Sequence, residues 1–350
     1  MNNQPQKILC VRMSAVGDVI NTLPAVEALR LSFPQAHISY LVEDRAYGVI
    51  EGHPSIDTVM LYPRKRWVQM MRKPAQWGQL FREFLVLRQA LRSKHYDVAL
   101  NFQSNLKGAL FTLLAGAGKR VGFAKNNSKE NSHIFNHISV SPEGGEHINR
   151  VEKFISLAAA IGADSSKASY RLPQRNDRKL VVQDWLNAQN LTRYAVIHPG
   201  TSDFGAKKRW QPERFAELAI RLHEECKLIP VITWGPGERE LAENIVTASA
   251  GTAVLAMQTS HLLDLAEITR NAQLYIGCDS GPLHLASAVG TPSVALFGPK
   301  DPRTYGPWNP HRRVVQKGQT DSAHLGVMSA IHTDDVMQSV NALLDEVAAA

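Results

Sequence analysis

Cysteine is scarce in this sequence: its 350 residues include only Cys10, Cys226 and Cys278, and no two of them form a CxxC pair. That scarcity argues against a disulfide framework or a structural zinc site and is typical of a reducing compartment. No run of about 18 apolar residues occurs, so no segment is expected to span a membrane. The first residues, MNNQPQK, contain no apolar core of a signal peptide, and we therefore expect a cytoplasmic location.

Several common cofactor and catalytic motifs are also missing. The loop at 14–18 is not GxGxxG, and Gly116–Lys119 is neither followed by Ser or Thr nor spaced as a P-loop, so NAD-dependent and ATPase functions are disfavoured. The sequence has no HExxH, no EF-hand loop and no nucleophile elbow. The absence of these motifs leaves a metal requirement open.

The charge balance, in contrast, is basic. Lys and Arg number 39 against 32 Asp and Glu, which gives a net charge of +7 and a pI near 9.3. Such a surplus favours an anionic partner: a phosphate-bearing substrate, a membrane face or nucleic acid. With 44% hydrophobic and 20% charged residues, the chain can bury full cores, and its length suits two domains.

Strand and helix patterns alternate along both halves of the chain. Short apolar runs predict strands at 7–12, 37–43, 56–62, 97–102, 120–123, 194–198, 228–233, 253–257, 274–278 and 293–297. Helical spacing predicts helices at 19–32, 77–93, 106–115, 147–160, 212–225, 238–248, 262–270, 282–289 and 334–347. This alternation is typical of an α/β fold with doubly wound parallel sheets that are covered on both faces.

The polar, aperiodic stretch 163–178 predicts a linker. We therefore expect two Rossmann-like domains, 1–170 and 171–350, with the last helix either in the second domain or packed back on the first. Two such domains of similar length imply a cleft, and ligands of these sheets bind outside the carboxyl ends of the strands.

The most informative stretch is Tyr275–Gly298, which reads as strand, turn, helix, turn and strand. Asp279, Ser280 and Gly281 follow the first strand, Pro282 suits a first helical turn, and His284 comes just after. Free N–H groups at such a helix start bind phosphate. An ordinary turn with Asp279 as the helix cap explains the stretch equally well.

Other strand-end loops carry similar residue types. Asp18 follows the first strand and is either a helix cap or a general base facing the cleft. Thr201 and Ser202 follow the first strand of the second half, just before the cations Lys207 and Lys208. Those cations form either a solvated surface run or a site where a pyrophosphate gains charge-assisted hydrogen bonds.

The next strand ends in Trp234-Gly235-Pro236-Gly237-Glu238. Glu238 either favours the N-terminal turn of its helix or accepts hydrogen bonds from ribose hydroxyls. Residues 64–94 form a second basic region, with nine cations against Glu83 and with Trp, Met and Phe interleaved. Basic and aromatic residues together are the pattern of a peripheral membrane contact; a nucleic-acid face and a solvated helix are the alternatives.

Taken together, these motifs resemble the ADP-heptose:lipopolysaccharide heptosyltransferases of glycosyltransferase family 9 over nearly the whole chain. The resemblance is carried by KILCVRMSAVGDVINTLPAVEALR, HPGTSDFGAKKRW, WGPGE and GCDSGPLHLASAVGTPSVALFGP. The segments YPRKRW, NFQSNLKGAL and EHINRVEKF look more like heptosyltransferase I than heptosyltransferase II. The resemblance implies a GT-B fold, in which an N-terminal domain binds the acceptor and a C-terminal domain binds the nucleotide sugar.

The resemblance also implies residue roles. Asp18 matches the catalytic base, and Lys208 matches the lysine that faces the donor phosphates, although a spacing three residues longer after His198 leaves the choice between Lys207 and Lys208 open. Glu238 matches the ribose-binding acid. The remaining donor-binding positions are Thr201, Ser202, Trp234, Asp279, Ser280, Gly281 and His284, and Arg64, Lys65 and Arg66 match a basic loop that meets acceptor phosphates and carboxylates.

The implied activity is an inverting transfer of heptose from ADP-L-glycero-D-manno-heptose to Kdo-lipid A in lipopolysaccharide core biosynthesis. The resemblance implies no metal and no cofactor beyond the ADP-heptose donor, and it implies peripheral association with the inner face of the cytoplasmic membrane. The alternatives are another nucleotide-sugar donor on the same fold, or a later core acceptor as for heptosyltransferases II and III. No recognition-helix or RNA-binding signature supports a nucleic-acid partner.

Overall fold

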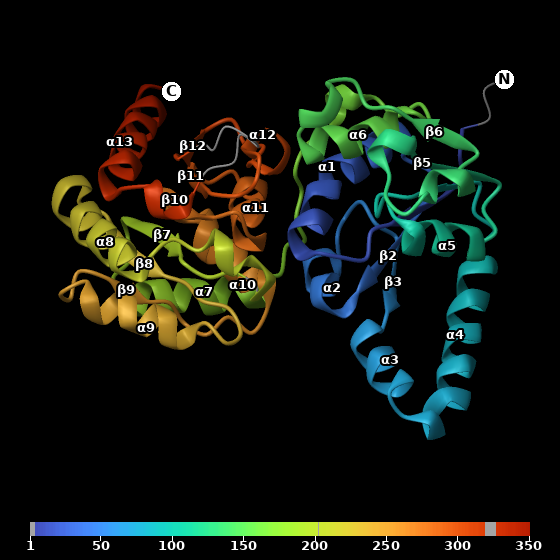
Figure 1. Cartoon of the computed structure of the whole chain (residues 1–350), viewed down its shortest axis with the longest axis horizontal. Helices are drawn as coiled ribbons and strands as arrows, with labels where there is room; N and C mark the ends of the chain where they lie inside the picture. The colour runs from blue at the N-terminus through green and yellow to red at the C-terminus, as the bar shows by residue number, and fades with distance from the viewer. Residues whose placement is uncertain (1–3, 202, 319–326) are drawn as a thin grey trace. The chain divides into compact units, whose positions relative to one another are not determined.

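The computed structural model describes residues 4–201, 203–318 and 327–350. The chain divides into two compact units, the first ending at Gln174 and the second beginning at Arg175, rather than at the predicted boundary of 170 and 171. Each unit is an α/β domain built on one six-stranded sheet (Figure 1). Among the described residues, no helix is both long and apolar enough to cross a bilayer.

The N-terminal domain has the strand order β3-β2-β1-β4-β5-β6, and all neighbouring strands are parallel. Its strands are β1 (Lys7–Val11), β2 (His37–Glu43), β3 (Thr58–Tyr62), β4 (Val98–Leu100), β5 (Lys119–Phe123) and β6 (Ile138–Val140). Its α-helices are α1 (Val16–Ser32), α2 (Asp44–Ile50), α3 (Arg64–Met71), α4 (Trp77–Arg92), α5 (Leu106–Leu114) and α6 (Arg150–Ala159).

Helix α1 is the central helix of this domain. Its residues from Val19 to Leu29 are all buried, because it packs against α6 and α2 as well as on the sheet. A helix that is apolar on nearly every side is expected at such a buried position. Helices α3 and α4, in contrast, extend away from the sheet as a hairpin (Figure 1).

The C-terminal domain repeats the topology, with the order β12-β11-β10-β7-β8-β9 and parallel neighbours throughout. Its strands are β7 (Tyr194–His198), β8 (Ile229–Ile232), β9 (Val254–Leu255), β10 (Leu274–Cys278), β11 (Ser293–Phe297) and β12 (Arg312–Gln316). Its α-helices are α7 (Asn176–Ala188), α8 (Pro212–Cys226), α9 (Arg239–Ala248), α10 (Leu262–Arg270), α11 (Gly281–Ala288), α12 (Pro302–Tyr305) and α13 (Thr333–Ala349).

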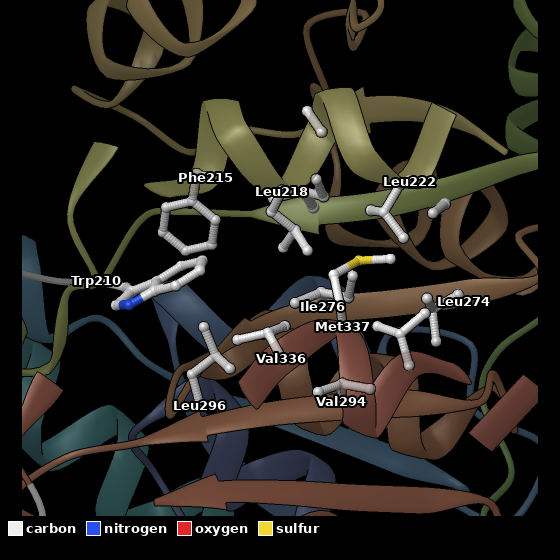
Figure 2. Packing of buried hydrophobic residues seen from close by; sticks show 14 of the residues in the cluster. Trp210, Phe215, Leu218, Leu222, Leu274, Ile276, Val294, Leu296, Val336 and Met337 are labelled. Carbon is white, nitrogen blue, oxygen red and sulfur yellow. The ribbon is translucent and has the colours of Figure 1, made fainter. Parts of the chain in front are cut away.

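One face of this second sheet is covered by α8 and α13, whose apolar side chains meet over β10 and β11 (Figure 2). Trp210 lies at one end of the cluster, edge-on to Phe215 with ring centroids 4.9 Å apart. Its indole N–H donates to the carbonyl of Ile331 at 2.9 Å. This buried anchor fixes the end of the loop that runs from β7 to α8.

The structure corrects several sequence-based expectations. The predicted linker at 163–178 contains the start of α7, and the last helix packs on α8 and β12 of the C-terminal domain. The segment at 64–66, expected to be a loop, is the first turn of α3. Elements β6, α2, α3, α7, α12 and β12 were not predicted.

Candidate active site

Both sheets place candidate residues where the strand order reverses. In the N-terminal domain the chain runs outward from β1 through β2 and β3, and in the other direction from β4 through β5 and β6. In the C-terminal domain β7 and β10 are the corresponding neighbours. Ligands of doubly wound sheets bind at this reversal, beyond the carboxyl ends of the two central strands. Asp18 follows β1, and Asp279 follows β10.

Lys208 and Asp279 form an ion pair at the reversal point of the C-terminal sheet. Lys208 Nζ lies 2.6 Å from Asp279 Oδ2, and the two side chains are 25% and 9% exposed. Neighbouring Lys207 is exposed. Of the two lysines that the sequence could not distinguish, Lys208 is therefore the one whose ammonium contacts Asp279.

The loop that carries Lys208 is held by side-chain contacts on both sides of it. The hydroxyl of Thr201 donates to the carbonyl of Gly205 at 2.9 Å and accepts from Nε of Arg209 at 3.1 Å. Arg209 also donates to the carbonyl of Thr201 at 2.5 Å. Because the Thr201 hydroxyl is used in this way, its observed role is to shape the loop. Ser202 lies outside the described residues.

Glu238 sits above the end of β7, as the N-cap residue of α9. Its Oε2 accepts from the backbone N–H of Gly235 at 2.9 Å. A Cβ added to Gly200 would lie 2.1 Å from the same oxygen. Gly200 is thus required for the carboxylate of Glu238 to approach the backbone of the β7 loop this closely.

His198 completes this corner of the C-terminal domain. Its Nδ1 lies 3.0 Å from Thr233 Oγ1, and its Nε2 lies 3.7 Å from Glu238 Oε2. Complete burial lowers the pKa of His198 to about 4, because desolvation disfavours the imidazolium. The ring is therefore neutral near pH 7, and its contact with Glu238 is not an ion pair.

The other predicted donor residues surround this region. Ser280 is the N-cap residue of α11, Gly281 is the first residue of the helix, and His284 is buried within it. The indole N–H of Trp234 donates to the carbonyl of Ala256 at 3.1 Å, and the Arg239 guanidinium lies 5.6 Å from the centre of the Trp234 ring system. The indole N–H of Trp234 is therefore already used within the protein, and its ring system lies next to the Arg239 guanidinium.

Asp18 lies in the first turn of α1, at the reversal point of the N-terminal sheet. Its Oδ2 accepts a long hydrogen bond of 3.4 Å from the N–H of Ala15, as a capping residue would. The same carboxylate forms ion pairs with Arg12 through Oδ2 and with Arg150 through Oδ1. The Asp18 side chain is 21% exposed, so it is both a cap and an accessible, charged carboxylate.

The predicted acceptor residues lie at the end of β3, two strands away from β1. Arg64 and Lys65 line a pocket of about 250 Å³ together with Glu43, Asp44, Arg45, Val68 and Gln69. Nε of Arg64 lies 3.9 Å from Oε2 of Glu43. Arg66 does not line this pocket; it pairs with Glu83 of α4 instead. The structure thus brings two of the three predicted acceptor cations into one concave site.

Three residues of these sites were not singled out from the sequence: Arg12, Arg150 and Gly200. Arg12 ends the predicted first strand, so its place beside Asp18 was open to inference from position alone. Arg150 is 132 residues from Asp18 in the chain, and only the packing of α6 on α1 brings the two together. Across the described ranges, no group of three or more His, Cys, Asp or Glu side chains is arranged to hold a metal ion.

Comparison with known proteins places these features in a family. A family model described as glycosyltransferase family 9 (heptosyltransferase) matches residues 84–331. The lipopolysaccharide core heptosyltransferase OpsX of Haemophilus influenzae is 25% identical, covering 89% of this chain and 84% of its own. A lipopolysaccharide heptosyltransferase 1 of Escherichia coli is 26% identical, with coverages of 89% and 91%. A lipopolysaccharide heptosyltransferase 3 of the same species is also 26% identical, with coverages of 94% and 96%.

Solved structures show the same fold. The crystal structure of a family 9 glycosyltransferase from Veillonella parvula has a TM-score of 0.80 at 22% identity and covers 99% of both chains. The E. coli heptosyltransferase WaaC with ADP has a TM-score of 0.77 at 22% identity, covering 96% of this chain and 99% of its own. The predicted pair of Rossmann-like, GT-B-type domains is confirmed.

Proposed function

This chain belongs to glycosyltransferase family 9, the heptosyltransferases of lipopolysaccharide core biosynthesis, and we propose that it transfers heptose from ADP-L-glycero-D-manno-heptose to Kdo-lipid A. The observation that carries the proposal is that each domain has its own kind of site at its strand ends. One domain holds an accessible carboxylate after β1, and the other holds a lysine, an aspartate and a glutamate around the ends of β7, β8 and β10.

In the proposed reaction, Asp18 accepts the proton of the acceptor hydroxyl as its oxygen attacks the anomeric carbon of heptose. One C–O bond forms, and the bond from the anomeric carbon to the ADP oxygen breaks, so the configuration inverts. A positioned base of this kind typically accelerates the reaction by about 10²–10⁴-fold. The ion pairs to Arg12 and Arg150 hold the carboxylate in place.

The leaving group is ADP, and the C-terminal domain supplies the charges that would stabilise it. The Lys208 ammonium and the N-terminal end of α11 face the region where the diphosphate would gain negative charge. Glu238 supplies the acceptor atoms that ribose hydroxyls require. These groups account for charge stabilisation without assigning a role to a metal.

The choice of donor and core step is the finer part of the proposal. Relatives of similar identity include both heptosyltransferases 1 and 3, and a different nucleotide sugar or a later core acceptor are the competing assignments. A panel of ADP-heptose, ADP-glucose and UDP-glucose, each with Kdo-lipid A and with a heptosylated core, separates them. We expect turnover only with ADP-heptose and Kdo-lipid A; turnover with another combination and not with this one would reject the assignment.

Asp18→Asn tests the base. We expect kcat to fall by about 10² or more while ADP-heptose binding, measured by calorimetry, stays within a few-fold. Asp164→Asn is the matched control, because Asp164 also caps a helix start in this domain but is fully exposed. Unchanged turnover of Asp18→Asn would return Asp18 to a purely capping role. Asp18→Glu retains the charge and guards against a folding defect.

We further propose that the α3–α4 hairpin contacts an anionic membrane surface. Residues 64–94 contain nine cations and one acid, which leaves 30 cations and 31 acids in the rest of the chain. The whole positive surplus therefore lies on this projecting hairpin (Figure 1). Trp77, Phe81 and Leu85, spaced four residues apart on α4, are 58%, 61% and 40% exposed. Exposed aromatic residues among cations are typical of interfacial helices.

Vesicle binding tests this contact. Trp77→Ser combined with Phe81→Ser should weaken binding to phosphatidylglycerol-containing vesicles at least tenfold, since each exposed aromatic loses its place in the interface. Leu180→Ser with Val181→Ser is the control, because these residues are also exposed, at 63% and 49%, on the other domain. Equal vesicle binding by both double variants would show that the hairpin faces solvent and does not contact the membrane.

A further inference from the structure

The surroundings of Asp18 contain more positive charge than one carboxylate can neutralise. Arg12 and Arg150 both pair with it, and Lys153 lies one turn after Arg150 on α6. Arg12 is fixed in the interior: it is 6% exposed, and its Nη1 donates to the carbonyl of Phe102 at 2.8 Å. Arg150 and Lys153 are partly exposed, and they are the members of the group that a ligand can reach.

Lys153 is held in place without an acidic partner among its described contacts. Its ammonium donates to the carbonyl of Asn127 at 2.8 Å and lies 4.5 Å from the centre of the Phe123 ring. Neither contact neutralises its charge. The carbonyl takes one of three donors, so the ammonium retains capacity for an oxyanion.

Like charges raise the free energy of this arrangement. Desolvation, Arg150, Arg12 and Lys129, in that order, lower the pKa of Lys153 to about 8. The acidic residues of this group are Asp18, which pairs with Arg150, and Glu152, which is exposed next to Lys153 in the sequence of α6. A cluster of cations that repel one another is relieved when an anion binds among them.

We infer that Arg150 and Lys153 form a subsite for an oxyanion of the acceptor, a carboxylate or a phosphate, beside the base Asp18. The inference rests on the proposed heptosyl transfer and locates a part of the acceptor that the Arg64 pocket does not account for. Its geometry has a consequence for Asp18: an oxyanion that engages Arg150 competes with Oδ1 for that guanidinium. Binding of the correct acceptor would therefore loosen one ion pair of the base at the moment the base is needed.

Kinetics of single variants test the subsite. Arg150→Gln and Lys153→Gln should each raise the KM for Kdo-lipid A about tenfold or more, as expected for the loss of a charge-assisted hydrogen bond. The KM for ADP-heptose should stay within about twofold. Lys125→Gln is the matched control, because it removes an exposed lysine just before Asn127. Equal effects of Lys125→Gln and Lys153→Gln on the acceptor would overturn the inference.

The pH profile provides a readout that a merely structural role would not move. The charged form of Lys153 binds the anion, so the wild-type KM for the acceptor should rise between pH 7 and 9 as the ammonium loses its proton. Lys153→Arg keeps the charge throughout this range and should flatten the rise. An identical rise in Lys153→Arg would assign the titration to another group and reject the role of Lys153.

Calorimetry with two acceptor fragments separates this subsite from the proposed function and identifies the anion. Free Kdo carries the carboxylate without phosphate, and lipid A carries phosphates without the carboxylate. Loss of affinity in Lys153→Gln for one fragment only names the anion that binds there. If neither affinity changes, the inference fails even though heptosyl transfer stands; if wild type transfers no heptose but the variants lose a fragment, the proposed function fails alone.

Discussion

Replacing Lys208 separates what the Lys208–Asp279 pair does for the fold from what it does for the donor. In Lys208→Ala the carboxylate of Asp279, which is only 9% exposed, loses the ammonium that lies 2.6 Å from it. A lost hydrogen bond to a charged group costs about 1.5–3 kcal/mol. Because the lysine is 25% exposed, water replaces part of that contact. We therefore expect the free energy of unfolding of the C-terminal domain to fall by about 2 kcal/mol.

Asp279→Asn should lower the free energy of unfolding by less, about 1 kcal/mol. The buried charge is then removed, and the lysine that remains can be solvated by water. Combined with Lys208→Ala it should recover about 1 kcal/mol of the loss. Urea unfolding followed by tryptophan fluorescence measures these differences as shifts of the midpoint at an unchanged slope. If the double variant is as unstable as Lys208→Ala, an unpaired Asp279 is not the origin of the loss.

Binding of ADP supplies the functional half of the experiment. Both Lys208→Ala and the stabilised double variant should bind ADP at least tenfold more weakly, since the charge that meets the diphosphate is absent from both. Exposed Lys207 provides the control, and Lys207→Ala should change neither stability nor affinity. Weaker ADP binding by Lys207→Ala together with normal binding by Lys208→Ala would reverse the assignment.

Three further predictions concern the surroundings of the two sites. Gly200→Ala places a Cβ 2.1 Å from Glu238 Oε2, so the free energy of unfolding measured in urea should fall by about 1–3 kcal/mol and ADP affinity should fall as well. Gly78→Ala is the control, because no atom lies within 4 Å of its Cβ and its stability should be unchanged. Similar losses of stability in both variants would contradict the clash. Burial of His198 lowers its pKa to about 4 from about 6.5 when unfolded, so the unfolded chain binds more protons between these values. Stability is then fully present above pH 6.5 and falls by about 3 kcal/mol on acidification to pH 4; His198→Asn should remove this part of the pH dependence, and equal dependence in both proteins would refute it. Lys107→Ala removes the ion pair at 2.5 Å to Glu43, which is 5% exposed, and should cost about 2 kcal/mol, whereas adding Glu43→Gln should restore most of it; an additive second loss would show that the charge of Glu43 was not the cost.

Three neighbouring strands of the C-terminal sheet could be predicted to the residue because they are short, mainly apolar runs. The structure has strands at Tyr194–His198, Leu274–Cys278 and Ser293–Phe297, all completely buried. Edge strands carry less information: β12 (RRVVQ) is half exposed and charged. Its place depends on pairing with β11 rather than on its own hydrophobic pattern.

Helix α3, which was not predicted, lacks local signals as well. Helix α3 begins at Arg64 after a proline N-cap that makes no side-chain hydrogen bond, and its first turn is three cations. Its position is set by tertiary contacts: Trp67 packs on Tyr62 with ring centroids 5.3 Å apart and donates from its indole to Glu83 at 2.9 Å. Such contacts override weak helix propensity and are invisible in the local sequence.

The contacts in the candidate sites also differ in how far the sequence could predict them. Lys208 and Asp279 follow neighbouring strands, so their proximity is a consequence of sheet topology that the strand pattern already implies. The contact between Asp18 and Arg150 is of another kind. It requires that α6 pack on α1 with its first turn beside the β1 loop, and neither spacing nor composition specifies that packing.

In both domains, most of the cations proposed to meet substrate oxyanions are already paired with internal carboxylates; Lys153, whose described contacts are a carbonyl and an aromatic ring, is the exception. Lys208 pairs with Asp279, Arg150 with Asp18, and Arg64 lies within 4.0 Å of Glu43. Pairing spares each partly buried charge the cost of standing alone in the apo protein. Substrate binding then exchanges one anion for another at these cations and releases fewer bound counterions than free lysines and arginines would. Binding of ADP should accordingly depend only weakly on salt, because Lys208 exchanges Asp279 for the diphosphate. Vesicle binding by the α3–α4 hairpin should weaken steeply between about 50 and 200 mM salt, because most of its cations lack carboxylate partners among the described ion pairs and salt screens exposed charges. A steep salt dependence for ADP would show that Asp279 does not hold Lys208 in solution.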